Sequence, residues 1–288
     1  MKHIFIIFCF SIFFSCKEKT PPGLELSNAL LSVDSSYTTT IESPQLKTIL
    51  VEEFTGVKCA NCPEEGAEAI VTLMNANPNR IIPVAIHAAG TFSEPLDKSK
   101  YDFRTKDGDD IRVLIGGFDG NPAAAINRVY TTDFGRIQAK TLWSNLIASE
   151  IEKKTPLNIS AVSDYDVNKN TINITTKVAF TSTVDDNLNL LIYVIENDIT
   201  DAQEDARFAE TILDYKFKHL FRKCITSTAG SPLNFADKNA GTVLQKRFSF
   251  EPTITGVNKW NLGNCHLVVF VTSSTSKEVI HTIEIPLK

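Results

Sequence analysis

The chain has 288 residues, a formal net charge of −5 and an isoelectric point near 5.6. This length is typical of two compact units. A composition of 43% hydrophobic and 22% charged residues is that of a folded globular protein. The acidic balance and the lack of a basic run argue against a surface that binds nucleic-acid phosphates.

The N-terminus has the pattern of an export signal over residues 1–16. A short basic start, Met1–His3, precedes the apolar run Ile4–Phe14, which is too short to span a bilayer as a permanent helix. The following Ser15-Cys16 resembles the end of a lipobox, in which Cys16 is acylated and becomes the mature N-terminus. The alternative is an ordinary cleaved secretory peptide with an incidental Cys16. Both alternatives predict export from the cytoplasm.

Residues 17–45 are rich in Lys, Glu, Ser, Thr and Pro and lack sustained periodicity. This composition predicts a flexible tether between the membrane and the folded part. The rest of the chain divides into residues 46–155, where strands alternate with helices, and residues 156–288, where the hydrophobic period is two.

Two of the six cysteines, Cys9 in the signal and Cys16 at the proposed lipid site, fall in the export segment. The other four are Cys59, Cys62, Cys224 and Cys265. An even number in an oxidising compartment permits two disulfides. Cys59 and Cys62 can close on each other, while Cys224 and Cys265 are candidates either for a structural cross-link or for a free buried pair.

Residues 46–155 begin with a β-α-β unit. The β-branched run Thr48–Phe54 predicts a buried strand that leads straight to the dithiol. Pro63 suits the first position of a helix, which Asn77-Pro78 ends, and Arg80–His87 predicts a second buried strand. The dithiol is therefore expected where a strand passes into a helix, in a right-handed parallel crossover.

This placement has chemical consequences. A thiolate at a helix N-terminus is stabilised by free backbone N–H groups, so the pKa of Cys59 is expected below the usual value of about 8.5. Lys58 adds a neighbouring positive charge. Cys59, expected at the exposed end, would attack a substrate disulfide, and Cys62, one turn inside, would resolve the mixed disulfide.

The segment resembles the thioredoxin superfamily. Glu53 and Phe54 match the acid and aromatic residue that precede the dithiol in that family, where the acid relays a proton for the second thiol. Strand neighbours face opposite sides, so an alternative is that Glu53 is exposed and Glu52 points inward. Asn121-Pro122 before the strand 123–127 resembles the cis-proline element that presents backbone groups to a substrate; the alternative is a trans proline in a loop.

Helices are also expected at Ser99–Leu114 and Gly135–Lys154, with an insertion around residues 88–115. The chain departs from thioredoxins at Lys58, where the family usually has Trp, and at Ala60-Asn61, where it has Gly-Pro. The residues between the cysteines tune redox potential in the family. They therefore do not identify this chain as oxidant, reductant or isomerase.

Residues 156–288 predict an all-β sandwich of the immunoglobulin-like class, an architecture more often used for binding than for catalysis. The acidic stretch Thr200–Ala209 is expected to be an exposed loop. The predicted strands are Leu157–Val162, Thr171–Phe180, Leu188–Glu196, Tyr215–Thr226, Val243–Phe250, Cys265–Thr272 and Val279–Ile285.

The mature chain as a whole resembles the outer-membrane lipoprotein family named after a twenty-eight-kilodalton outer membrane protein. The motifs that carry this resemblance are Glu53–Gly56 leading to the dithiol and Pro63, Asn121-Pro122 before Asn127-Arg128, His219–Lys223, and Val268–Val271 followed by Glu278-Val279. The resemblance implies an outer-membrane location, either periplasmic or surface-facing, and a thioredoxin-like fold, without a defined reaction.

Other chemistries have little support. A zinc site needs four ligands, and the chain has one CxxC without a second pair; His219 and His266 lie near Cys224 and Cys265 in sequence, but a lone His beside a strand is usually not a ligand. No phosphate-binding Gly-rich loop or nucleophile elbow is present. We therefore expect no metal and no cofactor.

Two functions of different class remain. The first is an envelope thiol–disulfide oxidoreductase that uses Cys59, Cys62, Glu53 and Pro122 on envelope proteins with thiols or disulfides. The second is a surface-anchored binding or structural lipoprotein whose CxxC is a closed, non-catalytic disulfide. Both contact the membrane through the N-terminal lipid, and the sequence does not fix the oligomeric state.

Overall fold

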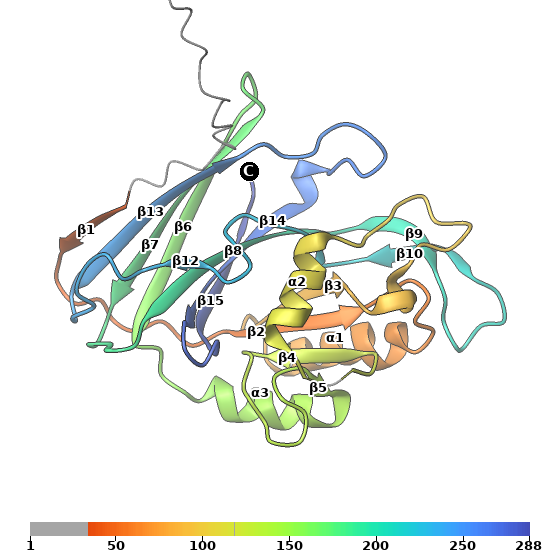
Figure 1. Ribbon diagram of the computed structural model, residues 1–288, viewed down its shortest axis with the longest axis horizontal. Helices are drawn as coiled ribbons and strands as arrows, with labels where there is room; N and C mark the ends of the chain where they lie inside the picture. Colours follow the sequence, from red (N-terminus) through yellow and green to blue (C-terminus); the bar gives the residue numbers. More distant parts are fainter. Residues whose placement is uncertain (1–33, 118) are drawn as a thin grey trace, which may run out of the picture. The chain divides into compact units, whose positions relative to one another are not determined.

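The computed structural model describes residues 34–117 and 119–288. The predicted signal peptide 1–16 with Cys16, and residues 17–33 of the predicted tether, lie outside the described residues. The described part is mostly β-strand with few helices (Figure 1). The helices are η1 (Cys62–Glu68, a π-helix), α1 (Ala69–Ala76), α2 (Lys106–Ile115), α3 (Trp143–Ile151) and the short 3-10 turns η2 (Gly90–Ser93), η3 (Lys140–Leu142) and η4 (Leu262–Asn264).

The strands form a nine-stranded sheet, a four-stranded sheet and a two-stranded ribbon within the described residues. The nine-stranded sheet has the order β15 (Val279–Pro286), β14 (Cys265–Ser273), β8 (Leu188–Glu196), β11 (Leu220–Cys224), β3 (Ile81–His87), β2 (Ile49–Thr55), β4 (Ala123–Ile126) and β5 (Gln138–Ala139), with β12 (Ser231–Pro232) also paired to β8. The four-stranded sheet is β1 (Ser35–Thr38), β13 (Thr242–Phe250), β7 (Thr171–Phe180) and β6 (Leu157–Asp166), and the ribbon pairs β10 (Ile212–Phe217) with β9 (Ile199–Gln203).

The predicted β-α-β unit is present. β2 pairs in parallel with β3, from Ile49 opposite Ile81 to Thr55 opposite His87, and the helix η1–α1 connects them. Pro63 occupies the first turn of that helix, as its missing N–H favours. β4, directly after Pro122, pairs antiparallel with β2 on its other side.

The alternation of β2 divides its side chains between two apolar layers. Ile49 and Val51 pack with α1 and α3 against Trp143 on one face. Leu50 and Phe54 face the other way, toward α2 and the strands β8 and β14. α2 therefore covers the face opposite to α1 and α3 (Figure 1), and the dithiol side of β2 is the α1 side.

The strands of the second half lie close to their predicted positions. Apart from β9 and β10 in the ribbon, they are divided between the two larger sheets, an arrangement consistent with a sandwich, while the immunoglobulin-like assignment stays a prediction. The predicted run Tyr215–Thr226 is two strands, β10 and β11, because His219 between them has a positive φ of 53° that interrupts extended backbone.

The predicted boundary at residues 155 and 156 does not separate two structural units. β11, β8, β14 and β15 from the second half continue the sheet of β2 and β3, through the parallel bridge of Leu220 to Ala85. The described residues, 34–117 and 119–288, accordingly belong to one compact unit. The open edge of β3 could not remain unpaired in a buried parallel sheet, and the second half supplies its neighbour.

Two expectations about irregular segments are wrong. Ser35–Thr38 of the predicted tether forms β1, paired with β13, and Gln45 donates its N–H to Asn158 Oδ1 at 2.7 Å. The predicted exposed loop Thr200–Ala209 contains most of β9, with Asp201 and Gln203 buried. Asp201 is satisfied by accepting the N–H groups of Lys100 at 2.8 Å and of Tyr101 at 3.0 Å.

The other helices are shorter than predicted. Instead of Ser99–Leu114, α2 starts after Thr105, whose hydroxyl accepts the N–H of Gly108 at 3.0 Å and so caps the helix. Instead of Gly135–Lys154, only Trp143–Ile151 is α-helical, because Gln138–Ala139 pairs with β4. No helix among the described residues is long and apolar enough to cross a membrane.

Candidate functional site

Cys59 and Cys62 form a disulfide between the end of β2 and the start of η1, with their Cα atoms 5.3 Å apart. The predicted position at a strand-to-helix junction is therefore observed. Cys62 is the first residue of the helix and donates its N–H to Cys59 O at 3.0 Å. Contrary to expectation, Cys59 is not at an exposed end: its exposed fraction is 4%, and that of Cys62 is 2%.

A segment of the second half covers the disulfide. Glu204 donates its N–H to Val57 O at 2.9 Å, and Ala206 donates to Ala60 O at 2.8 Å. The buried Gln203 donates its side-chain N–H to Gly56 O and to Cys59 O, each at 3.3 Å. We call residues 203–208 the covering segment, because it is hydrogen-bonded to the backbone of the loop that contains the cysteines.

An ion-pair cluster holds the covering segment on the helix. The Arg207 guanidinium contacts both carboxylate oxygens of Glu68, at 2.8 and 3.1 Å, and both of Asp205. Lys58, expected to act on Cys59, is paired with Glu94 at 3.1 Å. The positive charge of Lys58 is therefore partly neutralised beside the dithiol.

An external thiol should reach the disulfide only when the covering segment opens. The opening of this segment should therefore limit the rate at which the disulfide is reduced. Replacing Arg207 by Met removes the contact with Glu68, so we expect reduction by dithiothreitol to become roughly two- to fivefold faster, a size typical of one partly exposed ion pair. The measurement is the rate of thiol release from the oxidised protein. Lys169→Met, in a remote exposed pair with Asp166, is the matched control. Equal rates for Arg207→Met and the parent would show that the segment does not limit access.

Glu53 lies on β2, six residues before Cys59, with its side chain on the helix side of the sheet. It is buried, with an exposed fraction of 4%, and its Oε1 has no hydrogen-bond partner among the described residues. Burial raises the pKa of Glu53 to about 8. The carboxyl group is thus mostly protonated at neutral pH and can give or take a proton there.

Gly66 makes room for this carboxyl group. A Cβ atom at Gly66 would overlap Glu53 Oε1 and would lie 3.0 Å from Pro122 Cβ. The peptide bond between Asn121 and Pro122 is cis. The helix that begins at Cys62, the strand of Glu53 and the turn of Pro122 therefore meet at Gly66, and the four predicted site residues are brought to one region.

The close approach at Gly66 predicts a specific cost. Gly66→Ala should lower the free energy of unfolding by about 1–3 kcal/mol, the usual range for an overpacked buried site. Urea denaturation measures this difference. In Gly263→Ala the nearest atom to the new Cβ is 3.4 Å away, so this control should be close to neutral. Adding Glu53→Ala should recover much of the loss; a Gly66→Ala protein as stable as the parent would contradict the geometry.

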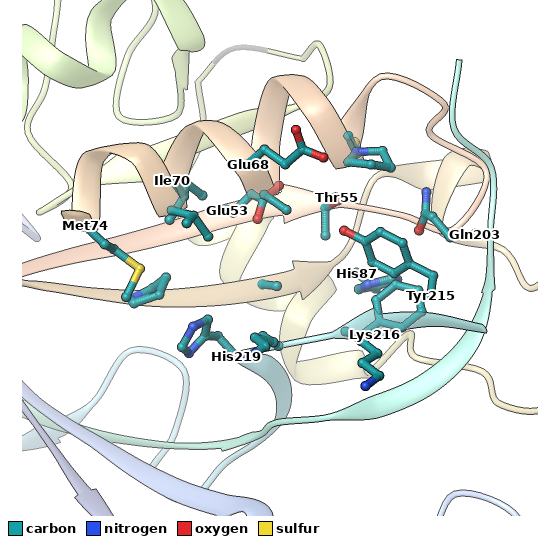
Figure 2. Close-up of a pocket in the computed structure, with 18 residues that line it drawn as sticks. Glu53, Thr55, Glu68, Ile70, Met74, His87, Gln203, Tyr215, Lys216 and His219 are labelled. Atoms are coloured by element: carbon teal, nitrogen blue, oxygen red, sulfur yellow. The ribbon is translucent and has the colours of Figure 1, made fainter. Parts of the chain in front are cut away.

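A pocket of about 180 Å³ opens beside the site, between the helix η1–α1 and the strand β10 (Figure 2). Its polar lining includes Glu53, Thr55 and His87 from β2 and β3, and Gln203 and Tyr215 from the ribbon. Its apolar lining includes Cys62, Pro63, Ile70, Val71, Met74, Pro83, Ala85 and Phe217. Burial raises the pKa of Tyr215 to about 12.

The sequence interpretation missed several of these residues. His87 was placed in the strand Arg80–His87 without a role. Gln203 and Arg207 lie in the stretch expected to be an exposed loop. Its acidic and polar residues lack the hydrophobic alternation of a strand, and the residues it contacts are distant in sequence. The only local signal at Gly66 is a glycine inside a helix, which often marks a close approach.

Glu52 is buried as well, on the opposite face of β2. Arg128 donates to its two carboxylate oxygens, each at 2.7 Å, and to Tyr193 OH at 2.7 Å. Burial lowers the pKa of Arg128, but Glu52 and Tyr193 more than offset this, so its pKa is raised overall. Each of the two alternatives is thus correct for one acid: Glu53 and Glu52 are both buried, on opposite faces of β2.

The proposed cross-link between Cys224 and Cys265 is wrong. Both cysteines are free and buried. Cys224 on β11 pairs with Tyr193 and Cys265 on β14 pairs with Glu196, so β8 lies between them. Two strand spacings amount to about 10 Å, beyond the ~7 Å limit between Cα atoms of a disulfide. Burial raises the pKa of each thiol to about 12.

No cluster of three or more His, Cys, Asp or Glu side chains that could hold a metal ion occurs in residues 34–117 and 119–288. His219 lies at the rim of the pocket, and burial lowers its pKa to about 4. His266 pairs with Glu284 at 2.6 Å. Neither histidine contacts the disulfide.

Comparisons with known proteins find similarity over part of the chain. The family model described as outer membrane protein Omp28 matches residues 116–285, a range that does not include the disulfide. A domain of the outer membrane lipoprotein Omp28 from Porphyromonas gingivalis is 18% identical, with 46% of this chain and 87% of that chain covered and a TM-score of 0.30. A FixG-related protein from Vibrio parahaemolyticus is 16% identical, over 45% of this chain and 91% of that chain, with a TM-score of 0.21.

No protein with a curated description matches the sequence. The matched range 116–285 is more than half of the chain. The protein therefore belongs to the outer membrane protein Omp28 family, which confirms the family that its motifs predicted and the outer-membrane location that this family implies.

Proposed function

We propose that the protein is a lipid-anchored thiol–disulfide oxidoreductase of the outer membrane, with a thioredoxin-like site at Cys59 and Cys62. The observation that carries the proposal is the buried carboxyl group of Glu53 on the strand that leads to the dithiol, whose Oε1 has no hydrogen-bond partner among the described residues. A pKa raised to about 8 suits it to proton transfer near neutral pH. Cys16 is the proposed site of the lipid.

The exchange reaction balances with these groups alone. In the reduced protein the Cys59 thiolate attacks one sulfur of a substrate disulfide, breaks the S–S bond and releases one substrate thiolate. Cys62 then gives its proton to the Glu53 carboxylate, and its thiolate attacks Cys59, which releases the second substrate thiolate. Two electrons pass to the substrate, and the Cys59–Cys62 disulfide is formed; the reverse sequence oxidises a substrate dithiol.

The neighbours of the dithiol would support this chemistry. Cys62 is the first residue of η1, and the positive end of a helix dipole favours a thiolate. Pro122, before β4, would present backbone groups to an extended substrate, as the resemblance to thioredoxins implies. The covering segment must move aside for a protein substrate, because both sulfurs are buried beneath it. Substrates would be envelope proteins with thiols or disulfides.

Trapping of the mixed disulfide tests this proposal. With dithiothreitol as electron donor, the parent protein should accelerate reduction of insulin. Cys62→Ala should lose turnover but accumulate an insulin adduct on Cys59, since no second thiol resolves it. Cys59→Ala is the control and should form no adduct. An inactive parent protein together with no adduct on Cys62→Ala would overturn the proposal.

A second function is favoured by one observation. The exposed fractions of Cys59 and Cys62, 4% and 2%, are those of a sequestered disulfide. In this alternative the protein is a surface-anchored binding or structural lipoprotein, and the disulfide ties the loop after β2 to the helix. Its reduction would then destabilise the loop without transferring electrons to any substrate.

A further inference from the structure

The pocket beside the disulfide has polar groups on its floor and apolar walls. Glu53 and Thr55 on β2 lie next to Ala85 and His87 on β3 in the parallel register. Strand geometry places the Cα atoms of Glu53 and His87 about 8 Å apart on a diagonal. Figure 2 shows Glu53 beneath the helix and His87 behind Tyr215, and both residues line the pocket.

These two polar groups lack partners within the described residues. Glu53 Oε1 and both ring nitrogens of His87 form no hydrogen bond, although the exposed fractions of the two residues are only 4% and 3%. A buried polar group without a partner is costly, and such groups are normally satisfied by protein, water or a ligand. Both residues line the pocket, so a molecule bound there lies next to them.

At neutral pH the Glu53 carboxyl group is mostly protonated and His87 is uncharged. Burial raises the pKa of Glu53 to about 8 and lowers that of His87 to about 3, with Asp102 acting weakly in the opposite direction on His87. The other titratable groups that line the pocket are Glu68, Tyr215, Lys216, Lys218 and His219. Glu68 is paired with Arg207, and Lys218 with Asp198 at 3.8 Å. The floor therefore suits an uncharged ligand that both donates and accepts hydrogen bonds.

The walls and the size favour a single ring. A cavity of about 150 Å³ is known to hold benzene, so the volume here, about 180 Å³, fits one ring with a small substituent. Ile70, Pro83 and Phe217 supply apolar surface, and the thioether of Met74 makes favourable contacts with aromatic rings. A hydroxyl on the ring can donate to and accept from the floor.

We propose that this pocket binds a phenol, either as a free small molecule or as the tyrosine side chain of a peptide. The proposal does not depend on the redox function, because the ring would bind to the oxidised protein and no bond to sulfur is made. A protein that binds phenol but shows no thiol exchange would contradict only the redox proposal. A protein that exchanges thiols but does not bind phenol would contradict only the present one.

Titration calorimetry of the oxidised full chain with p-cresol and with toluene tests the proposal. We expect p-cresol to bind roughly tenfold more tightly than toluene, the size of one hydrogen bond to a buried group. His87→Phe, which keeps the ring packing against Phe103 and Phe217, should remove much of this preference and leave toluene affinity unchanged. Ala85→Phe should fill the pocket and abolish binding of both.

The outcomes separate the alternatives. A pocket filled by water alone would show no p-cresol binding, and this result would overturn the proposal, as would equal affinities for p-cresol and toluene. Circular dichroism checks that both variants fold, and His87→Phe remains informative if Ala85→Phe does not. A short tyrosine peptide that binds more tightly than p-cresol supports the side chain as the natural ligand, while exclusion of the peptide with binding of p-cresol supports a free phenol.

Discussion

Arg128→Met is expected to lower the free energy of unfolding by about 3–5 kcal/mol, because it leaves the Glu52 carboxylate buried without its partner. Arg128 and Glu52 are almost completely buried, and two hydrogen bonds of 2.7 Å join them. Tyr193 OH contacts the same carboxylate at 3.0 Å. One hydroxyl cannot replace the charge and the second donor that the substitution removes.

Urea denaturation of the parent and two variants measures this effect. Arg104→Met, which breaks a half-exposed pair with Asp102, is the control and should cost no more than about 1 kcal/mol. The double variant Glu52→Gln with Arg128→Met removes both charges and should recover part of the loss. An Arg128→Met protein within 1 kcal/mol of the parent would refute this account of the buried pair.

Glu53→Gln should stabilise the protein progressively as the pH rises from about 4.5 to about 8. The pKa of Glu53 is raised from 4.5 to about 8 by burial, so in this range the folded protein keeps a proton that the unfolded chain has lost. Stability then falls as pH rises, by about 1.4 kcal/mol per unit. Glutamine has the same shape and no charge, and it avoids this loss.

The difference between the two proteins should be small below pH 4.5, grow to about 3–5 kcal/mol and level off above pH 8. Urea denaturation at a series of pH values measures it. The exposed Glu210→Gln is the control and should show no such trend. His87 titrates in both proteins alike and cancels in the comparison. A constant difference across this pH range would contradict the raised pKa.

Local patterns predicted the elements around the dithiol because their causes are local. β-branched runs and a proline after Cys62 are enough to place β2, η1 and β3, and the alternation of strand residues places Glu53 on the helix side. The strands of residues 156–288 were predicted for the same reason. The alternation of hydrophobic residues is visible within each strand and does not depend on which strand it pairs with.

Long-range pairing could not be predicted in this way. The sheet that joins β3 to β11 depends on the single bridge of Leu220 to Ala85, far apart in sequence. The burial of Asp201 depends on backbone N–H groups at Lys100 and Tyr101, and such partners leave no trace in the local pattern. The same holds for the covering segment, which turns an expected exposed dithiol into a buried disulfide.

The redox potential of the Cys59–Cys62 pair tests the proposed function most directly. Equilibration of the full chain in dithiothreitol buffers, followed by alkylation of free thiols, gives the fraction reduced at each potential. An exchanging site predicts a potential above about −300 mV, within reach of envelope thiols and disulfides. A potential well below about −300 mV would contradict the account and identify the pair as a structural disulfide.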